Sequence, residues 1–359
     1  MRVVWVSHRD LDDPRAGGSE RFSFEVLRRL AEMGETVRWV TTSGPFSQSL
    51  RRESGVEIQR IGRPWLGHAT WPLVLQSTPR PDVVVDELGH VVPWGSERFG
   101  GTPGTAYFQH LHRRTLPGQV SPVAAQILGR IESSYRRVYP TWPFATGCES
   151  SARDLETIGI ARRRIRVIPL GVDLDRFTPG PRSERPSLLY FGGLKRYKRP
   201  EVAIDLLAAL RARRLDASLT VLGSGPLVEA LVQRAGAAGV AEHVRFAGRL
   251  PDEEVPRLVR SAWLNVHASV AEGWCLSALE AAASGVPTVA FDVVGVRDTV
   301  GAGRSGELVP DGDLASMVEA AGRLLAEPER YREGSREWAE QFPWSRTAES
   351  WREYLSSLR

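Results

Sequence analysis

The sequence predicts an α/β protein built from two doubly wound domains, and three observations support this. The chain has 359 residues, more than one hydrophobic core usually organises. Short apolar, β-branched segments alternate with helical patterns through both halves. A stretch rich in proline, glycine and charge, FTPGPRSERP at residues 177–186, separates the halves. We therefore expect an N-terminal domain over residues 1–180 and a C-terminal domain over residues 181–343.

Ten segments have the length and composition of buried strands. In the first half they are MRVVWVSH, TVRWVTT, DVVVDEL, TAYFQH and FATGCES. In the second half they are SLLYFGG, LTVLGSG, VRFAGRL, LNVHAS and PTVAFDV. Between the first two of these, a helix from Glu201 to Leu210 would align its apolar side chains on one face: Ala203, Leu206, Leu207 and Leu210. Strands that alternate with helices predict a parallel sheet in each half.

The C-terminal segment PWSRTAESWREYLSSLR reads as a helix at about residues 344–359. Its apolar stripe consists of Trp351, Tyr354, Leu355 and Leu358. Such a stripe can bury itself against either domain.

Composition restricts the class of protein. Hydrophobic residues make up 42% and charged residues 25%, as in globular proteins. The first residues lack the pattern of a secretory signal, and no apolar run reaches the roughly 20 residues that span a bilayer. With only Cys148 and Cys275, a disulfide framework is excluded. We expect a soluble cytoplasmic protein that starts at Met1. The net charge of +4 fits phosphate ligands but also an arginine-rich surface.

The segment AEGWCLSALEAAASGVP contains the richest constellation. Glu272 and Gly273 follow a predicted strand, and the next residues form a helix that contains Glu280. A strand, a glycine turn and a helix start expose backbone N–H groups and a positive dipole end, which suit a diphosphate. Glu272 would accept hydrogen bonds from sugar hydroxyls, and Glu280 from a ribose diol. The alternative is a capped helix with two solvated acids.

The segment YFGGLKRYKRP holds both lysines of the chain, Lys195 and Lys198, together with Arg196 and Arg199. If no metal takes part, cationic side chains must neutralise the charge that grows on a leaving diphosphate. A solvated basic turn is the alternative, and it is the commoner case for an isolated run of charge.

Glycine turns and two histidines complete the candidate set. Gly223 in LGSGP ends a strand, and Gly17 and Gly18 in AGGSE precede the first helix, where backbone can pass close to a phosphate or sugar. His110 and His112 close the TAYFQH strand on one side of an extended chain. No third His or Cys joins them at a recognisable spacing, so we expect no metal site. His68 and His243 read as solvated surface residues.

One motif is a decoy. GAGRSG at residues 301–306 matches the dinucleotide fingerprint as a string, but it follows a helical stretch and precedes a short strand, ELV. The fingerprint requires strand, glycines and helix in that order. We therefore interpret these glycines as a turn and expect no nicotinamide cofactor.

Taken in order, AGGSE, VIPLGVDLDRF, GGLKRYK, LGSGP and the pair Glu272 and Glu280 resemble the retaining GT-B glycosyltransferases of family 4, over nearly the whole chain. The resemblance implies two Rossmann-like domains facing across a cleft. The nucleotide sugar would lie on the C-terminal domain and the acceptor mostly on the N-terminal one. The C-terminal helix would pack back on the first domain, and no cofactor or essential metal would be needed.

The resemblance also assigns roles. Lys198 would hold the diphosphate, Glu272 a sugar hydroxyl and Glu280 the ribose, while His110 rather than His112 would lie by the anomeric carbon. The catalytic candidates are thus His110, Lys198 and Glu272. The donor-binding candidates are Gly17, Gly18, Gly193, Arg196, Gly223, Gly273, Trp274, Cys275, Leu276 and Glu280.

The chain departs from the family pattern at two places. Gly193 stands where the family often has an arginine before the leucine of GGLKRYK, so one phosphate-binding cation is missing unless Arg196 or Lys195 replaces it. Trp274 and Cys275 stand where phenylalanine and glycine are common, which would make a bulkier wall of the sugar pocket.

The function that the resemblance implies is transfer of a hexose, with retention, from a nucleotide-diphosphate donor, UDP or GDP first, to a hydroxyl of a glycoside, polysaccharide or glycolipid. The alternatives are an epimerase or hydrolase of the same fold, and a protein that binds the nucleotide sugar without turnover. No nucleic-acid partner is expected. Contact with the inner face of a membrane stays open, through arginines that equally suit a solvated face: Arg113, Arg114, Arg136 and Arg137.

Overall fold

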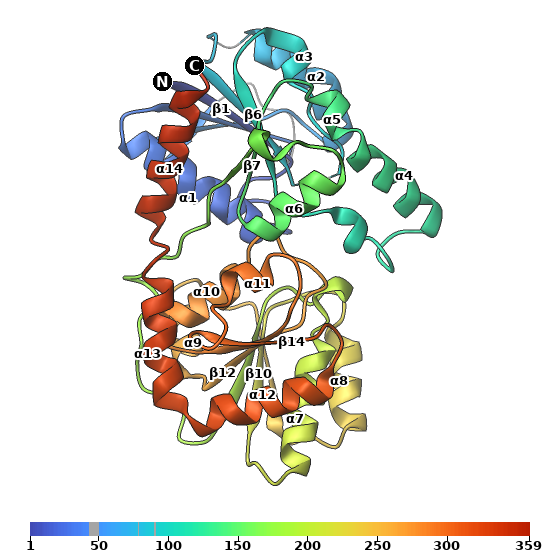
Figure 1. Ribbon diagram of the computed structural model, residues 1–359, viewed down its shortest axis with the longest axis vertical. Helices are drawn as coiled ribbons and strands as arrows, with labels where there is room; N and C mark the ends of the chain where they lie inside the picture. Colours follow the sequence, from blue (N-terminus) through green and yellow to red (C-terminus); the bar gives the residue numbers. More distant parts are fainter. Residues whose placement is uncertain (43–49, 78, 90) are drawn as a thin grey trace. The chain divides into compact units, whose positions relative to one another are not determined.

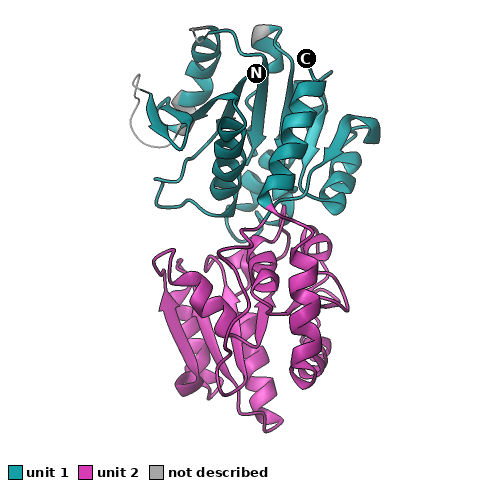
Figure 2. Ribbon diagram, turned by 90° about the vertical axis from the view of Figure 1, so that its left-hand side faces the viewer, with its two compact units in different colours: residues 1–171, 344–359 teal, residues 172–343 magenta. Residues whose placement is uncertain are grey.

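The computed structural model describes residues 1–42, 50–77, 79–89 and 91–359. The chain divides into two compact units, residues 1–171 with 344–359 and residues 172–343 (Figure 2). The first unit ends at Gly171 rather than at residue 180. The reason is that Val172 already bonds within the second unit, donating its N–H to the Phe342 carbonyl at 2.8 Å.

Unit 1 contains an eight-stranded sheet in the order β3-β4-β2-β1-β5-β6-β7-β8. The five predicted strands are β1 (Arg2–Ser7), β2 (Thr36–Thr41), β5 (Val83–Leu88), β6 (Gly104–Phe108) and β7 (Phe144–Thr146). Three further strands are β3 (Arg51–Glu53), β4 (Val56–Arg60) and β8 (Ile165–Val167). β3 pairs antiparallel with β4, and the other pairs are parallel.

The helices of unit 1 are α1 (Gly18–Glu32), α2 (Pro64–Ser77), α3 (Glu97–Gly100), α4 (Pro122–Ser133), α5 (Tyr135–Val138), α6 (Glu149–Thr157) and α14 (Trp344–Ser357). The C-terminal helix α14 lies beside α1 (Figure 1). Trp351 is fully buried there, with its ring 5.0 Å from that of Trp5. The hydroxyl of Tyr354 lies 2.9 Å from that of Thr105 on β6. Trp351, Tyr354 and Leu355 of the predicted stripe therefore belong to the core of unit 1, whereas Leu358 follows the end of α14 and is half-buried.

Unit 2 contains a six-stranded parallel sheet in the order β11-β10-β9-β12-β13-β14. Its strands are β9 (Ser187–Phe191), β10 (Ser218–Leu222), β11 (Val244–Gly248), β12 (Leu264–His267), β13 (Thr288–Phe291) and β14 (Gly306–Val309). The first five match the predicted segments. β14 is the short ELV strand, and the glycines before it form a turn, closed by a bond from the Gly303 amide to the Gly306 carbonyl.

The helices of unit 2 are α7 (Glu201–Ala212), α8 (Val228–Ala237), α9 (Val255–Ser261), α10 (Leu276–Ala283), α11 (Val296–Thr299), α12 (Leu314–Ala326) and α13 (Pro328–Ala339). The four apolar residues that the sequence places on one face of α7 are all buried in the core of the unit. None of the helices in the described part of the chain combines the length and apolar character needed to cross a bilayer.

Both sheets are doubly wound, which locates their ligand sites. In unit 2 the chain moves outward from β9 through β10 to β11, then restarts at β12 on the other side of β9. In unit 1 the same reversal falls between β1 and β5. Ligands of open α/β sheets bind outside the carboxyl ends of the strands at such a switch point. The loops that follow β9 and β12, and those that follow β1 and β5, are therefore where sites are expected.

Candidate functional site

The loops after β9 and β12 bring two of the three catalytic candidates together. Lys198 ends the short 3₁₀ turn Arg196–Lys198 that follows β9, and Glu272 lies in the loop between β12 and α10. Nζ of Lys198 donates to Oε1 of Glu272 at 2.8 Å. Ser269 Oγ donates to the same oxygen at 2.6 Å. Nε2 of His267 lies 3.4 Å from it. One carboxylate oxygen thus gathers three polar partners at the switch point of unit 2.

The two charges hold each other ionised. Burial alone would raise the pKa of Glu272, but Lys198 and His267 reverse this and hold it well below its usual range. Burial likewise opposes the charge of Lys198, and the carboxylate of Glu272 raises the pKa of that ammonium well above its usual value. The side chains are 20% and 12% exposed, so water weakens the pair only partly. A dianionic diphosphate beside this cluster would meet a fixed positive charge.

Sequence reasoning missed His267, the last residue of β12. Its side chain is 5% exposed, and both ring nitrogens lie 3.4 Å from Sγ of Cys275. Burial alone would lower the pKa of His267, but Cys275 and Glu272 raise it to about 9. The contact of its Nε2 with Oε1 of Glu272 at 3.4 Å restricts the orientation of that carboxylate. The available signal was its place at the carboxyl end of a strand next to the switch point.

Backbone amides at the start of α10, which the sequence suggests are available to a diphosphate, already have hydrogen-bond acceptors within the protein. Cys275 is the residue before its first turn, and its amide donates to Oγ1 of Thr299 at 3.1 Å. The amide of Leu276 donates to the Trp274 carbonyl at 3.2 Å. A phosphate that takes these two N–H groups has to displace both bonds. Glu280 lies within α10 and is 7% exposed, which contradicts the reading of a solvated acid.

Trp274 is buried within unit 2. It is 7% exposed, and its ring packs edge-on against Phe342 at 5.4 Å. Its indole Nε1 has no hydrogen-bond partner among the described residues. A buried donor without a partner carries a free-energy cost, so this nitrogen is a natural point for a polar ligand group.

The four cations of the GGLKRYKR segment do not act together. Arg199 adopts a left-handed backbone conformation with φ of 46° and holds the β12 loop. It donates to the carbonyls of Ala268 at 2.5 Å and Ser269 at 3.1 Å and forms an ion pair with Asp311. Arg199 therefore supports the loop that follows β12, whereas Lys198 pairs with Glu272.

Gly193 and Gly223 differ in the room around them. A Cβ at Gly193 would find its nearest neighbour, Cε of Lys195, at 3.8 Å, so a side chain fits there. A Cβ at Gly223, with φ of 144°, would lie 1.9 Å from the Gly192 carbonyl oxygen. The close approach of the Gly192 backbone therefore requires a glycine at position 223.

His110 and His112, the two candidate histidines of unit 1, lie just after β6. Their rings stack with centroids 4.9 Å apart. His112 is anchored, because its amide donates to Oε1 of Glu132 at 2.5 Å and its Nε2 lies 3.2 Å from the Gly89 carbonyl. Burial would raise the pKa of Glu132, but His112 and Arg113 hold it below its usual value. The backbone amide and the ring of His112 are thus both held by contacts within unit 1.

Gly17 and Gly18 open α1 as predicted. Oε2 of Glu20 accepts the Gly17 amide at 2.8 Å, which caps the start of the helix from the side of Glu20 alone. Oε1 of Glu20 pairs with Nε of Arg9 at 3.0 Å. The capped helix start lies near the end of β1, one of the two strands at the switch point of this unit.

His68 corrects the sequence reading of a solvated residue. Its ring stacks on Trp94 with centroids 4.3 Å apart, and its Nε2 lies 3.2 Å from Nε2 of His8. Burial lowers the pKa of His68. Aromatic packing of this kind is available to a histidine because its ring is largely apolar when neutral.

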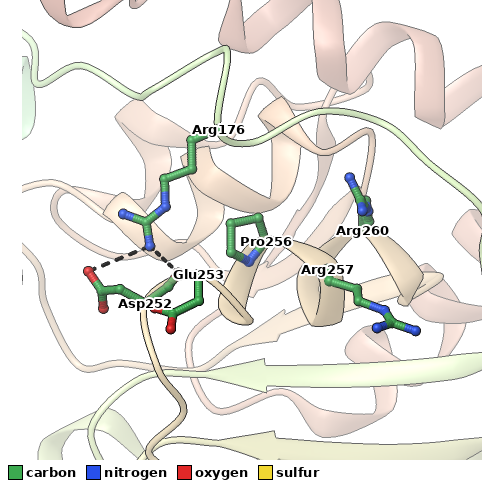
Figure 3. Close-up of a pocket in the computed structure, with 6 residues that line it drawn as sticks. All are labelled: Arg176, Asp252, Glu253, Pro256, Arg257 and Arg260. Atoms are coloured by element: carbon green, nitrogen blue, oxygen red, sulfur yellow. Dashed lines mark hydrogen bonds and ion pairs between the residues drawn. The ribbon is translucent and has the colours of Figure 1, made fainter.

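A cavity of about 540 Å³ lies elsewhere in unit 2. It is lined by Arg176, Asp252, Glu253, Pro256, Arg257 and Arg260 (Figure 3). None of the candidate site residues is among them. Arg176 reaches across to Asp252, and Arg257 points away from that pair, so the arginines do not converge on one point.

The fold and these loops define a class: a protein of two Rossmann-like units with a cationic, carboxylate-linked site at the switch point of the second. Two family models match, "Glycosyltransferase Family 4" over residues 16–176 and "Glycosyl transferases group 1" over residues 172–341. The chain belongs to glycosyltransferase family 4. It is a glycosyltransferase, and its fold is GT-B.

Known proteins are similar to this chain, some over nearly its whole length and others over about half of it. The D-inositol 3-phosphate glycosyltransferase of Geodermatophilus obscurus is 30% identical over 98% of this chain and 87% of its own length. The GDP-mannose-dependent alpha-(1-6)-phosphatidylinositol monomannoside mannosyltransferase of Mycolicibacterium smegmatis is 36% identical over 45% of this chain. The chain spans about half the length of that relative, 47%, and 52% of the D-inositol 3-phosphate glycosyltransferase of Nocardia farcinica.

A solved structure agrees in fold. The sucrose-phosphate synthase of Thermosynechococcus elongatus superposes with a TM-score of 0.80, covering 99% of this chain and 98% of its own, at 21% identity.

Proposed function

We propose that this glycosyltransferase moves a hexose, with retention of anomeric configuration and without a metal, from a UDP or GDP sugar to an acceptor hydroxyl. The observation that carries the proposal is the cluster of Lys198, His267 and Glu272 at the switch point of unit 2. Its excess positive charge suits a diphosphate, and its carboxylate suits sugar hydroxyls.

The proposed step is a same-face displacement. The bond between the anomeric carbon and the diphosphate oxygen breaks, and a bond from that carbon to the acceptor oxygen forms on the same face. The acceptor proton passes to the departing phosphate oxygen. Lys198, with the N-terminal end of α10, stabilises the negative charge on this oxygen. Glu272 binds sugar hydroxyls, Glu280 the ribose, and His110 lies beside the anomeric carbon.

The choice of substrates rests on the relatives. One is named for GDP-mannose and a phosphatidylinositol monomannoside, and another for inositol 3-phosphate. The first name favours GDP as the donor nucleotide, and both names favour a polyol or glycolipid hydroxyl as acceptor. We place the reaction in the cytoplasm, since both cysteines are free thiols buried in the fold.

The test begins with thermal shift against UDP, GDP, ADP, dTDP and NAD. Saturation at about 100 times the dissociation constant stabilises a protein by roughly 2.7 kcal/mol. A shift with one nucleoside diphosphate that disappears in Glu280→Ala supports the donor site. A shift with NAD alone contradicts the proposal.

Product analysis with the identified nucleotide sugar then separates the alternatives. Release of free sugar or of an epimer without an acceptor indicates a hydrolase or epimerase. Tight binding without transfer to any polyol, glycan or glycolipid acceptor indicates a binding protein. Near-normal turnover in both Lys198→Ala and Glu272→Ala contradicts the assigned roles.

A further inference from the structure

Helix α4 exposes aliphatic side chains to solvent. Val123 is 68% exposed and Ile127 is 52% exposed. Val120, just before the helix, is 37% exposed. Figure 1 shows α4 at the edge of unit 1, away from its sheet. Exposed apolar groups that gather on one helix indicate a binding surface more often than scattered ones do.

Helix geometry puts these residues and two arginines on one stripe. At 3.6 residues per turn, Val123, Ile127 and Arg130 share a face, and Glu132 points to the opposite side. Ser134, between α4 and α5, keeps a right-handed helical conformation, so the turn continues and brings Arg137 onto the same stripe. Glu132 is fully buried, whereas Arg130 and Arg137 are exposed.

Charge around this stripe has one sign. Residues 113–138 contain five arginines and one acid, the buried Glu132. Arg113 pairs with Glu132, and Arg114 pairs with Asp154. These two arginines, which the sequence suggested for lipid contact, are therefore already neutralised. No ion pair within the described part of the chain involves Arg130, Arg136 or Arg137. The unpaired positive charge therefore lies on α4 and α5, after the two arginines that are already paired.

Helix α8 of unit 2 shows that apolar exposure alone is not distinctive. Val228 and Val232 are 38% and 50% exposed and stand four residues apart, as Val123 and Ile127 do. However, Glu229 lies beside them, and Arg234 is paired with Asp205 at 2.6 Å. The two helices match in aliphatic exposure and differ in charge, which makes α8 a suitable internal control.

We propose that the α4 face, defined as Val120, Val123, Ile127, Arg130 and Arg137, docks on an anionic lipid bilayer. An interfacial helix of this kind places aliphatic groups at the acyl boundary and arginines at the phosphates. A second copy of the chain is the less suitable partner. Three aliphatic side chains fall short of the roughly 800 Å² that each partner of a stable complex buries, and a symmetric contact would oppose like charges.

The experiment is co-sedimentation of the full chain with vesicles of phosphatidylcholine containing phosphatidylglycerol, and with vesicles of pure phosphatidylcholine. We expect binding to the anionic vesicles, weakened by high salt, and little binding to the neutral ones. Val123→Asp with Ile127→Asp lowers the partition coefficient about tenfold or more, and so does Arg130→Glu with Arg137→Glu. The matched control, Val228→Asp with Val232→Asp, leaves it unchanged. Circular dichroism confirms that each variant is folded.

Three outcomes overturn the proposal: no binding of the wild type to anionic vesicles, equal binding to neutral vesicles, or equal loss in the α8 control. A concentration-dependent dimer that disappears in Val123→Asp with Ile127→Asp, without vesicle binding, assigns the face to a second copy instead. None of these readouts depends on catalysis, so the result is independent of the proposed function.

Discussion

Nζ of Lys198 lies 2.8 Å from Oε1 of Glu272, although 74 positions separate the two residues in the chain. The pair joins the loop after β9 to the loop after β12, across the switch point of the sheet in unit 2. Because both side chains are largely buried, each charge depends on the other for its stability. A diphosphate that engages Lys198 must therefore share it with Glu272, which leaves the carboxylate more available to sugar hydroxyls.

This relationship predicts a strong coupling between the two side chains. Lys198→Ala and Glu272→Ala each leave an unpaired buried charge, so each lowers the free energy of unfolding by about 3 kcal/mol. The double variant should lose less than the sum, because it removes both charges. Urea denaturation of the four proteins measures the coupling. Additive losses would contradict the pair as a stabilising unit.

The same variants separate stability from catalysis. At a temperature where all are folded, Lys198→Ala should lower kcat/KM by about 10²–10³, since it removes a cation from the leaving oxygen. Arg211→Ala is a control, because Arg211 binds Asp216 and the Ala217 carbonyl away from the site.

His267 predicts a pH dependence of stability. Its pKa is raised to about 9 in the folded protein from an ordinary value of 6.5. The stabilisation is complete below pH 6.5 and is lost as pH rises through 9. We expect the free energy of unfolding to fall by about 1–3 kcal/mol across this interval, and His267→Gln to abolish that part of the slope. Denaturation at pH 6, 7.5 and 9.5 measures it. The control is His243→Gln, and an unchanged slope in His267→Gln would show that the imidazole stays neutral.

Two glycines of unit 2, Gly193 after β9 and Gly223 after β10, should respond in opposite ways to substitution. Gly193→Arg restores the cation expected from the family pattern, and the open space around Gly193 accepts it. We expect a folded enzyme with KM for the donor unchanged or lower. Gly223→Ala would drive a methyl group into the Gly192 carbonyl at a positive φ, so it should destabilise unit 2 by more than 1 kcal/mol. Thermal denaturation and donor titration compare the variants. A destabilised Gly193→Arg would mean that the loop closes over this position.

Much of the fold could be predicted from the sequence because parallel strands buried on both faces are nearly continuous apolar runs. β4 escaped this criterion, since VEIQR alternates apolar and polar residues as an outer strand does. Proline and glycine near residue 180 mark a loop, and the sequence therefore predicts a boundary there. The division after Gly171 coincides with a non-local contact, the Val172 bond to Phe342, which no local pattern indicates.

The candidate site was predictable only as separate pieces. Lys198 and Glu272 stood out by composition and motif, but no local pattern reveals that they meet. His267 ends an apolar strand, where a histidine carries no periodic signal. Its partners Glu272 and Cys275 follow in a loop whose path the sequence does not specify.

Glu87 on β5 gives a pH-dependent prediction for unit 1. Its side chain is buried and accepts hydrogen bonds from Trp5 at 2.9 Å, Ser23 at 2.7 Å and Gln109 at 3.1 Å. Burial raises its pKa to about 7, against the lowering effect of Ser23 and Trp5. Because the folded pKa exceeds the ordinary 4.5, this group's stabilising contribution is present below pH 4.5 and is lost as pH rises through 7.

Glu87→Gln should therefore gain stability relative to the wild type as pH increases, by about 2–3 kcal/mol between pH 4.5 and 8. The amide of Gln109 can rotate so that its oxygen faces the new amide group, which keeps the hydrogen bonds satisfied. Parallel urea denaturation at pH 5 and pH 8 measures the difference, with Glu57→Gln as the control, since Arg52 and Arg38 hold the pKa of Glu57 below its usual value despite burial. That control should lose stability at pH 8 instead. Equal behaviour of the two variants would show that Glu87 stays ionised in the folded protein over this pH range.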